Sequence, residues 1–288
     1  MRQEQRFPGV PIKAVISDLA GTTVDFGSCA PAGAFVELFA RHNIQATAAE
    51  ARGPMGIHKR DHIRTMLDMP TLSKQWIGVH GKAWTERDLD DLYEEFIPMT
   101  LEALPRYSRV IPGIVEAVGK LRAQGVKIGV STGYNNEMLR IVLEKAAEGG
   151  FVPDAAICAA DVPKGRPAPW MIFRLMEVLD VYPPTAVIKI GDTIADIEDG
   201  RNAGVWTVGV TRTGNLVGLT EAELNALAPD EQARRIAAAR EQLLAAGAHC
   251  VVDSFADLPD RIATRVPSRF GVEGLSEKNQ DLQDLCGY

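Results

Sequence analysis

The stretch KAVISDLAGTTVD, residues 13–25, decides the fold of this chain. Its first part is a short run of apolar and β-branched residues, which is typical of a strand buried in a sheet. The glycine and two threonines at 21–23 then predict a turn. Asp18 therefore stands where the strand ends, and α/β sheets bind their ligands at the carboxyl ends of their strands.

Outward from this stretch, strands and helices alternate along the chain. Apolar runs predict further strands at 126–130, 155–158, 186–190, 206–210 and 249–253. Helical patterns are found at 32–41, 89–104, 113–124, 136–147, 170–179, 198–203 and 231–246. This alternation predicts βαβ units, and hence an α/β fold with a doubly wound parallel sheet.

One segment does not fit this alternation. Residues 29–105 are mostly helical and are too long for a plain connection between two strands. We therefore expect an inserted helical cap domain at 29–105 and an α/β core domain made of 1–28 and 106–267. Residues 268–288 show no clear pattern and are expected to form a loosely held C-terminal tail.

The composition of the 288 residues is that of a globular protein, with 46% hydrophobic and 24% charged residues. The net charge of −7 argues against a general nucleic-acid surface, which would need a basic excess. No run of about 18 apolar residues is present, so we expect no transmembrane helix. The N-terminal stretch lacks an apolar signal core, so a cytoplasmic protein is expected. The cysteines have no metal-binding spacing and are predicted to be buried or free thiols: Cys29, Cys158, Cys250 and Cys286.

The predicted strand ends carry side chains that suit a metal ion and a phosphoryl group. Asp18 and Asp192 follow two of the strands, and carboxylate oxygens are the ligands that Mg²⁺ prefers. A carboxylate can also attack phosphorus and form an aspartyl phosphate. Arg166 and the hydroxyl of Thr132 could hold the transferring oxygens. Asp196, four residues after Asp192, is expected to orient the site from behind the direct ligands.

These residues lie in segments that resemble the four motifs of the haloacid dehalogenase-like superfamily. The segments are DLAGTTVD at 18–25, STG at 131–133, GRP at 165–167 and GDTIAD at 191–196. Phosphatases of that superfamily carry a second aspartate two residues after the nucleophile, which protonates the leaving alcohol. Here that position is Ala20, which cannot transfer a proton. Either the protein has lost its activity, or its leaving group needs no acid at this position. A carbon leaving group that is stabilised by a protonated imine would fit, and the enzyme would then need an amine to form that imine.

The predicted cap offers that amine in the segment MGIHKRDHIR, residues 55–64. Lys59 stands there among cations, and we expect Arg60, Arg64, His58 and partial burial to lower its pKa. This segment, with DLAGTT at 18–23, TGY at 132–134 and GRPAPW at 165–170, resembles the phosphonoacetaldehyde hydrolase family.

That resemblance implies a function and a set of site residues. Lys59 would form a Schiff base and Asp18 would accept the phosphoryl group. A magnesium ion would be held by Asp18, Asp192 and the main-chain carbonyl of Ala20. The resemblance also implies a small-molecule substrate, phosphonoacetaldehyde, a homodimer, and a role in breaking down 2-aminoethylphosphonate. It implies supporting roles in imine formation or proton transfer for Met55, His62 and Tyr134.

The sequence departs from the family pattern at two positions in the first motif region. Leu19 stands where a tryptophan is common, and Ser28 stands where a cysteine is common. Neither change removes a reactive group. Ser28 could alter how the aldehyde end of the substrate is held.

Two other functions stay open on the sequence alone. An ordinary phosphatase or phosphomutase would release phosphate from simple esters, and Ala20 argues against it. A non-catalytic binding or regulatory relative would bind a ligand tightly without turnover. Loss of Asp18, Asp192 or Arg166 would have favoured that second alternative, and all three residues are present.

Overall fold

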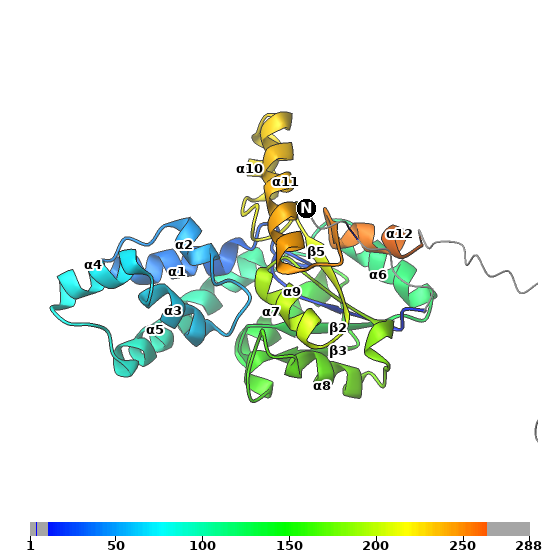
Figure 1. The fold of residues 1–288 in the computed structure, drawn as a ribbon, viewed down its shortest axis with the longest axis horizontal. Coiled ribbons are helices and arrows are strands. Elements are labelled where there is room, and N and C mark those ends of the chain that lie inside the picture. The colour runs from blue at the N-terminus through cyan, green and yellow to red at the C-terminus, as the bar shows by residue number, and fades with distance from the viewer. Residues whose placement is uncertain (1–3, 5–10, 264–288) are drawn as a thin grey trace, which may run out of the picture.

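The computed structural model describes residue 4 and residues 11–263 of the chain. Within these residues, six parallel strands form one sheet in the order β3-β2-β1-β4-β5-β6. Figure 1 labels β2, β3 and β5 of this sheet. The strands are β1 Ala14–Ser17, β2 Lys127–Thr132, β3 Ala155–Cys158, β4 Val187–Gly191, β5 Trp206–Val210 and β6 Cys250–Val252. The predicted doubly wound parallel sheet is confirmed. The predicted tail at 268–288 and the last residues of the predicted core lie outside the described residues.

The strand β1 is the centre of the sheet, and its neighbours fix where the strands end. Ser17 is paired with Val130 of β2 on one side and with Ile190 of β4 on the other. All four residues of β1 are buried, as expected for a parallel strand covered on both faces. The carboxyl ends of β1, β2 and β4 therefore lie side by side at one edge of the sheet.

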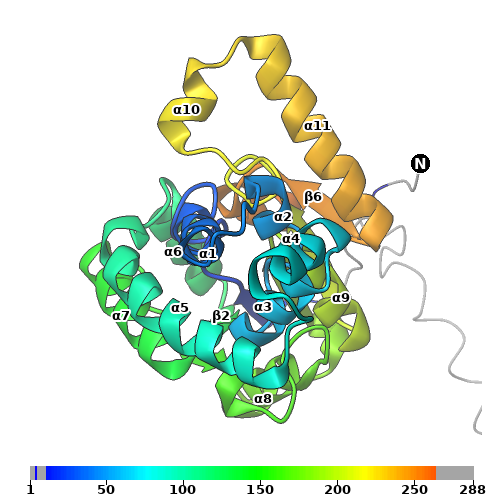
Figure 2. The same cartoon turned by 90° about the vertical axis from the view of Figure 1, so that its left-hand side faces the viewer.

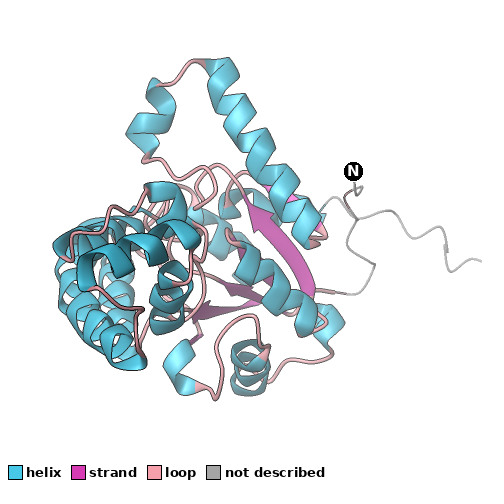
Figure 3. Cartoon of the chain, turned by 60° about the vertical axis from the view of Figure 1, so that its left-hand side comes forward, coloured by secondary structure: helices cyan, strands magenta, loops and turns pink. Residues whose placement is uncertain are grey.

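Helices cover both faces of the sheet (Figure 3). Val15 and Ile16 point to opposite faces, because side chains alternate along a strand. Ile16 packs in a cluster with Ile172 and Leu175 of one helix, whereas Val15 belongs to the larger core on the other face. The helices after the insertion are α6 Ile114–Ala123, α7 Asn136–Glu148, α8 Trp170–Val178, α9 Ile194–Asn202, α10 Glu221–Ala226, α11 Pro229–Ala246 and α12 Leu258–Ala263.

The helix α9 begins four residues earlier than the sequence pattern predicted. The predicted start was Glu198, but the helix begins at Ile194. The reason is a capping box, in which the Thr193 side chain accepts from the backbone N–H of Asp196 and the Asp196 carboxylate bonds back to Thr193.

Six helices lie between β1 and β2 in the described residues, and the first five of them, all before α6, are called the cap helices below. They are α1 Cys29–Arg41, α2 Ala48–Arg52, α3 Lys59–Leu67, α4 Pro70–His80 and α5 Glu86–Tyr107. The rings of Phe35 and Phe96 stack at 4.3 Å and join α1 to α5. Figure 1 shows these helices gathered at the left-hand end of the molecule, and Figure 2 shows the same end turned toward the viewer. The all-helical character of this segment agrees with the sequence pattern, and the division into two domains stays a prediction.

The structure also bears on two predicted absences. None of the helices in residues 11–263 is both long enough and apolar enough to cross a membrane. The three cysteines within those residues are free thiols, as predicted: Cys29, Cys158 and Cys250. Cys286 lies outside the described residues.

Candidate active site

Three polar residues stand where the central strands end. Asp18 follows β1, Thr132 is the last residue of β2, and Asp192 follows β4. Each is buried, with exposed fractions of 6%, 4% and 0%. The sheet register therefore brings these predicted site residues together from three distant parts of the sequence.

The turn after β1 holds Asp192 in place. Gly21 adopts a φ of +80°, and a Cβ at this position would come within 2.2 Å of Asp192 Oδ2. The hydroxyl of Thr22 donates to Asp192 Oδ1 at 2.9 Å. The backbone N–H of Asn215 donates to Asp192 Oδ2 at 2.8 Å. Both oxygens of this carboxylate thus have a fixed donor, and only glycine fits beside it.

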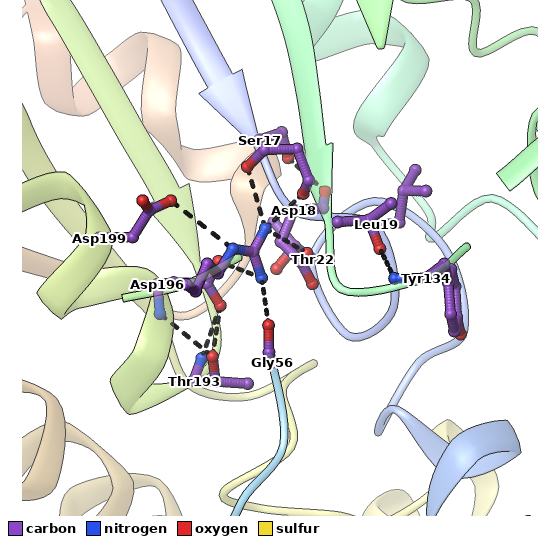
Figure 4. A network of polar contacts seen from close by, with 12 residues as sticks. Ser17, Asp18, Leu19, Thr22, Gly56, Tyr134, Thr193, Asp196 and Asp199 are labelled. Atoms are coloured by element: carbon purple, nitrogen blue, oxygen red, sulfur yellow. Dashed lines mark hydrogen bonds and ion pairs between the residues drawn. The ribbon is translucent and has the colours of Figure 1, made fainter. Parts of the chain in front are cut away.

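Arg166 is the cation at the centre of the site, and its side chain is completely buried. One terminal nitrogen donates to Asp18 Oδ1 at 2.8 Å and to both oxygens of Ser131. The other terminal nitrogen donates to the Gly56 carbonyl at 3.2 Å and pairs with Asp196 Oδ1 at 2.9 Å. Figure 4 shows Asp18, Gly56 and Asp196 converging from different elements on this guanidinium. Arg166 therefore joins the carboxyl edge of the sheet to the loop that leads into α3.

Two further charged residues complete this buried network. Lys189 lies within β4, and its amine is 2.7 Å from Asp196 Oδ1. Asp199 lies on α9, with Oδ2 at 3.6 Å from Nε of Arg166. Burial alone would lower the pKa of Arg166, but Asp196, Asp18 and Asp199 outweigh it and raise the pKa. The guanidinium is thus held in its charged form.

The carboxylates of the site differ in how well their charge is offset. Burial raises the pKa of Asp18, although Arg166 lowers it in part. Burial and then the Asp18 carboxylate raise the pKa of Asp192 well above its ordinary value. Burial would also raise the pKa of Asp196, but the charges of Arg166 and Lys189 outweigh burial and lower this pKa. Asp18 and Asp192 are therefore the pair whose negative charge lacks a full partner.

This arrangement fits a divalent metal ion. Oxygens of Asp18, Asp192 and Asp196 lie within 4.8 Å of one another, and all three residues are buried. A cation between Asp18 and Asp192 would relieve the repulsion that raises the pKa of Asp192. Asp196 already pairs with Arg166 and Lys189, so it is better suited to orient the site than to bind the ion.

A small pocket lies above these carboxylates, between the strand ends and the cap helices. It is lined by Asp18, Ala20, Ser28, Pro31, Met55, Gly56, Lys59, Thr132, Gly133, Tyr134 and Thr193. The pocket thus brings together the carboxylate expected to attack phosphorus and the cap lysine expected to form an imine. Its free volume is about 20 Å³, which is enough for about one water molecule. A larger ligand therefore requires this pocket to widen.

Lys59 reaches the pocket from the first turn of α3 and is only 4% exposed. Its amine lies 3.9 Å from the Met55 sulfur. The same amine lies 5.1 Å from the centre of the Tyr134 ring and 5.7 Å from that of Phe35. This amine therefore lies beside a thioether and two aromatic rings.

The pKa of Lys59 is lowered to about 8, as predicted, and the predicted contribution of burial is confirmed. Burial is the main cause, and Arg166 lowers the pKa further, whereas Asp18 raises it. The predicted neighbours Arg60 and Arg64 both pair with Glu86 at the outer surface of the cap helices. Their charges are offset there, so the expectation that they lower the pKa of Lys59 was wrong.

His62 lies behind Lys59 on α3 and is not among the residues that line the pocket. Its ring stacks on Phe35 at 3.7 Å, and Nε2 lies 2.9 Å from the Ala51 carbonyl. A carbonyl can only accept, so Nε2 carries the proton. Nδ1 has no hydrogen-bond partner among the residues that the structure describes. Burial and then the Lys59 charge lower the pKa of His62 well below its ordinary value, so the ring is neutral.

Sequence reasoning missed three residues that contact the predicted site. Lys189 interrupts an apolar strand, and a lysine in such a position signals a buried ion pair. Asp199 lies three residues after Asp196 and hence on the same side of α9. Asn215 lies in a loop with no periodic pattern, and no signal in the sequence could have found it. Ser131 also contributes to the site, because its hydroxyl accepts from Arg166 at 2.9 Å.

Comparisons with known proteins agree with this geometry. The profile of a family described as haloacid dehalogenase-like hydrolase matches residues 12–204. A phosphonoacetaldehyde hydrolase from Syntrophobacter fumaroxidans is 44% identical over 88% of this chain and 91% of its own length. One from Paraburkholderia xenovorans is 45% identical over 86% of this chain and 92% of its own. The crystal structure of a phosphonoacetaldehyde hydrolase-like protein from Oleispira antarctica, 41% identical, aligns with a TM-score of 0.85 over 93% of this chain and 100% of that chain.

The sheet, the strand-end motifs and the family profile define the chain as a haloacid dehalogenase-like hydrolase. Within that class, the chain belongs to the phosphonoacetaldehyde hydrolase family. The resemblance inferred from the motifs and the prediction of a hydrolase are both confirmed.

Proposed function

We propose that this chain hydrolyses the carbon–phosphorus bond of phosphonoacetaldehyde and releases acetaldehyde and phosphate. The observation that carries the proposal is the buried amine of Lys59, which lines the same pocket as Asp18. The residue at the position of the phosphatase acid is Ala20, which lines that pocket as well. The relatives that bear the name of this activity support the substrate.

The first step is condensation of the Lys59 amine with the aldehyde carbon, with loss of one water. This step needs the neutral amine, and the lowered pKa of about 8 provides it near neutral pH. The Met55 sulfur and the Tyr134 ring pack beside the amine and keep it from water. They serve imine formation by helping to bury the amine, because burial favours its uncharged form. We assign His62 a supporting role, because its ring holds Phe35 against this part of α3.

The second step is attack of an Asp18 oxygen on phosphorus. The oxygen–phosphorus bond forms as the carbon–phosphorus bond breaks, and the bonding electrons move toward the protonated imine to give an enamine. No acid is required at position 20, because the imine takes up the electrons. The phosphoryl oxygens would be held by Arg166, which donates to Asp18, and by the hydroxyl of Thr132, which lines the pocket. The enamine then gains a proton at carbon, and water releases acetaldehyde from Lys59. A second water cleaves the aspartyl phosphate.

A magnesium ion fits the carboxylates of this site. Asp18 and Asp192 would hold it together with the main-chain carbonyl of Ala20, and Asp196 would orient the site from behind them. When bound, the ion would offset the negative charge of the phosphoryl oxygens and bring them toward Asp18.

The cap helices have a part in this scheme, because the closed pocket holds about one water molecule. The cap helices would open to admit the substrate and close to exclude bulk water from the imine. A homodimer, a cytoplasmic location and a role in 2-aminoethylphosphonate breakdown stay expectations from the family.

The test is a direct assay of products. Phosphonoacetaldehyde is supplied with and without Mg²⁺, and acetaldehyde is followed with coupled alcohol dehydrogenase while phosphate is measured in parallel. We expect equal amounts of both products and a requirement for the metal ion. Phosphate release from a simple phosphate ester, without acetaldehyde from the phosphonate, would instead support an ordinary phosphatase. Binding of the phosphonate without either product would support a non-catalytic protein.

A further inference from the structure

Arg52, the last residue of α2, connects the cap helices to the core loop that follows β5. Its Nη1 donates to Asn215 Oδ1 at 3.1 Å and to the Gly27 carbonyl at 2.8 Å. The amide of Asn215 donates from Nδ2 to the Arg52 carbonyl at 3.1 Å. The same Nη1 of Arg52 also donates to the Asn215 carbonyl at 3.5 Å, so three hydrogen bonds, one of them from core to cap, join one cap residue to one core residue. Asn215 is only 2% exposed, so water does not readily replace Arg52.

The same asparagine contacts Asp192 through its backbone. The N–H of Asn215 donates to Asp192 Oδ2 at 2.8 Å, and the Thr22 hydroxyl donates to the other oxygen at 2.9 Å. Both donors come from the core, but one of them belongs to a residue whose side chain is held by the cap. Donors of this kind set the orientation of a metal-binding carboxylate.

The loop around Asn215 packs closely against both of its partners. A Cβ on Gly214 would lie 2.6 Å from Cβ of Asp192. A Cβ on Gly218, whose φ is +66°, would lie 2.7 Å from Nε of Arg52. The backbone of the loop is therefore in direct contact with Asp192 at one point and with Arg52 at the other. A displacement of Arg52 would move Asn215, and with it the donor to Asp192.

We propose that Asn215 is a positioning residue that couples docking of the cap helices to the orientation of Asp192, with Arg52 as the cap residue of this connection. The proposal rests on the proposed function in one respect, namely that Asp192 binds the metal ion. With the cap helices docked, Arg52 holds Asn215, and the Asp192 carboxylate is fixed by two donors. With the cap helices displaced, one of those donors is free to move. An arginine suits this position because its planar guanidinium group can donate to several acceptors at once.

The experiment measures the affinity for Mg²⁺ of the full chain without substrate, by calorimetric titration. The variants are Arg52→Ala, Asn215→Ala and the double variant. Asn215→Ala keeps the backbone N–H that faces Asp192 and removes the two side-chain hydrogen bonds to Arg52. We expect each single variant to weaken Mg²⁺ binding by about tenfold, the lower end of the effect of losing a group that orients a metal ligand. The double variant should bind no more weakly than the weaker single variant, since both remove the same connection.

A kinetic measurement distinguishes positioning from simple attachment of the cap. In the Arg52→Ala protein, the Mg²⁺ concentration needed for half-maximal acetaldehyde release should rise. The KM for phosphonoacetaldehyde at saturating Mg²⁺ should stay unchanged. The Arg52→Lys variant keeps the positive charge but lacks the planar guanidinium group, and we expect it to behave like Arg52→Ala.

The matched control is Arg41→Ala, which removes a cap arginine that pairs with Glu37 at the surface. It should leave Mg²⁺ affinity unchanged. Unchanged affinity in folded Arg52→Ala and Asn215→Ala proteins, or additive losses in the double variant, would overturn the coupling. If Arg52→Ala does not fold, Asn215→Ala and Arg52→Lys decide the question in the same way. The titration needs no turnover, so its outcome is separate from a failure of the wild type to release acetaldehyde, which would overturn the proposed function.

Discussion

Lys59 is the residue whose surroundings are most difficult to explain by stability alone. Lysines are almost never fully buried without a charged partner. This one is 4% exposed, and its amine lies beside the Met55 sulfur and the Tyr134 ring. Such surroundings disfavour the ammonium form and keep the pKa at about 8. A site that needs a neutral amine benefits from the burial that would otherwise only cost stability.

The lowered pKa of Lys59 gives a prediction about pH. Below a pKa of about 8, the neutral fraction of the amine falls tenfold for each unit of pH. We therefore expect kcat/KM for acetaldehyde release to rise with pH and to level off above about pH 8. Circular dichroism over the same range separates this effect from unfolding. A rate that does not change between about pH 6 and 9 would mean that another group or step limits the reaction.

At the residue scale, the sequence predicted the strand-end groups better than their neighbours. Asp18, Arg166 and Asp192 could be found because each follows or flanks a recognisable strand and motif. The charged neighbours that act on the pKa of Lys59 could not be found, because Arg60 and Lys59 are adjacent in sequence but face different surroundings. Only the packing of α3 against α5 shows that Arg60 is paired with Glu86 and Asp90.

At the scale of elements, the contact between the end of β2 and the loop before α3 closes the site. A Cβ on Gly133 would lie 2.3 Å from the Ile57 carbonyl and 2.9 Å from the Gly56 carbonyl. The Gly56 carbonyl in turn accepts from Arg166 at 3.2 Å. The cap loop therefore touches the core at the position where the phosphoryl group is expected to bind.

This contact predicts the effect of a single methyl group. Gly133→Ala should push the cap loop away from Arg166, lowering kcat/KM by about tenfold or more because the reacting groups are displaced. The overpacked contact should also lower the free energy of unfolding by about 1–3 kcal/mol. Acetaldehyde release and chemical denaturation measure the two effects.

The matched control for this prediction is Gly119→Ala on α6. A Cβ at Gly119 would meet no atom within 4 Å. Because alanine favours helix more than glycine does, this variant should gain about 0.5–1 kcal/mol of stability and keep its activity. Full activity in the Gly133→Ala protein would contradict the proposed importance of the cap–core contact.

The sequence pattern predicted the strands of the sheet, but it did not predict where every helix begins or how every loop packs. β1, β2 and β4 were found because buried parallel strands are continuous apolar runs. The start of α9 was placed at Glu198 because its first turn carries a buried aspartate that serves the site, so the apolar pattern is interrupted there. The loop that carries Asn215 has no periodic pattern of apolar residues, and its contacts arise only from tertiary packing.

For the whole molecule, the carboxyl edge of the sheet concentrates buried negative charge. The buried acidic residues of the site are Asp18, Asp192, Asp196 and Asp199. This negative charge is offset only in part by the nearby cations, which are Arg166, Lys189 and the partly neutral Lys59. A bound divalent cation would complete the balance, so the free energy of unfolding should depend on it.

We therefore expect Mg²⁺ to stabilise the fold. At about 100 times its dissociation constant, the ion should raise the free energy of unfolding by about 2.7 kcal/mol. Asp192→Asn should abolish this response, because an amide is a poor replacement for a charged ligand. The metal-free variant should be more stable than the metal-free wild type, since its repulsion with Asp18 is removed. Thermal unfolding with Mg²⁺ or with a chelator measures both effects. An Asp192→Asn protein that responds to Mg²⁺ like the wild type would place the ion elsewhere.

The central claim is that Lys59 forms an imine with the substrate beside Asp18, and reductive trapping tests it most directly. Sodium borohydride is added during turnover of phosphonoacetaldehyde, and peptides are then mapped by mass spectrometry. The account predicts loss of activity that requires substrate and an N-ethyl group on Lys59, formed when hydride reduces the imine of acetaldehyde. The Lys59→Arg protein should neither turn over nor be labelled. Acetaldehyde release by Lys59→Arg, or trapping at a different lysine with Lys59 unmodified, would contradict the account.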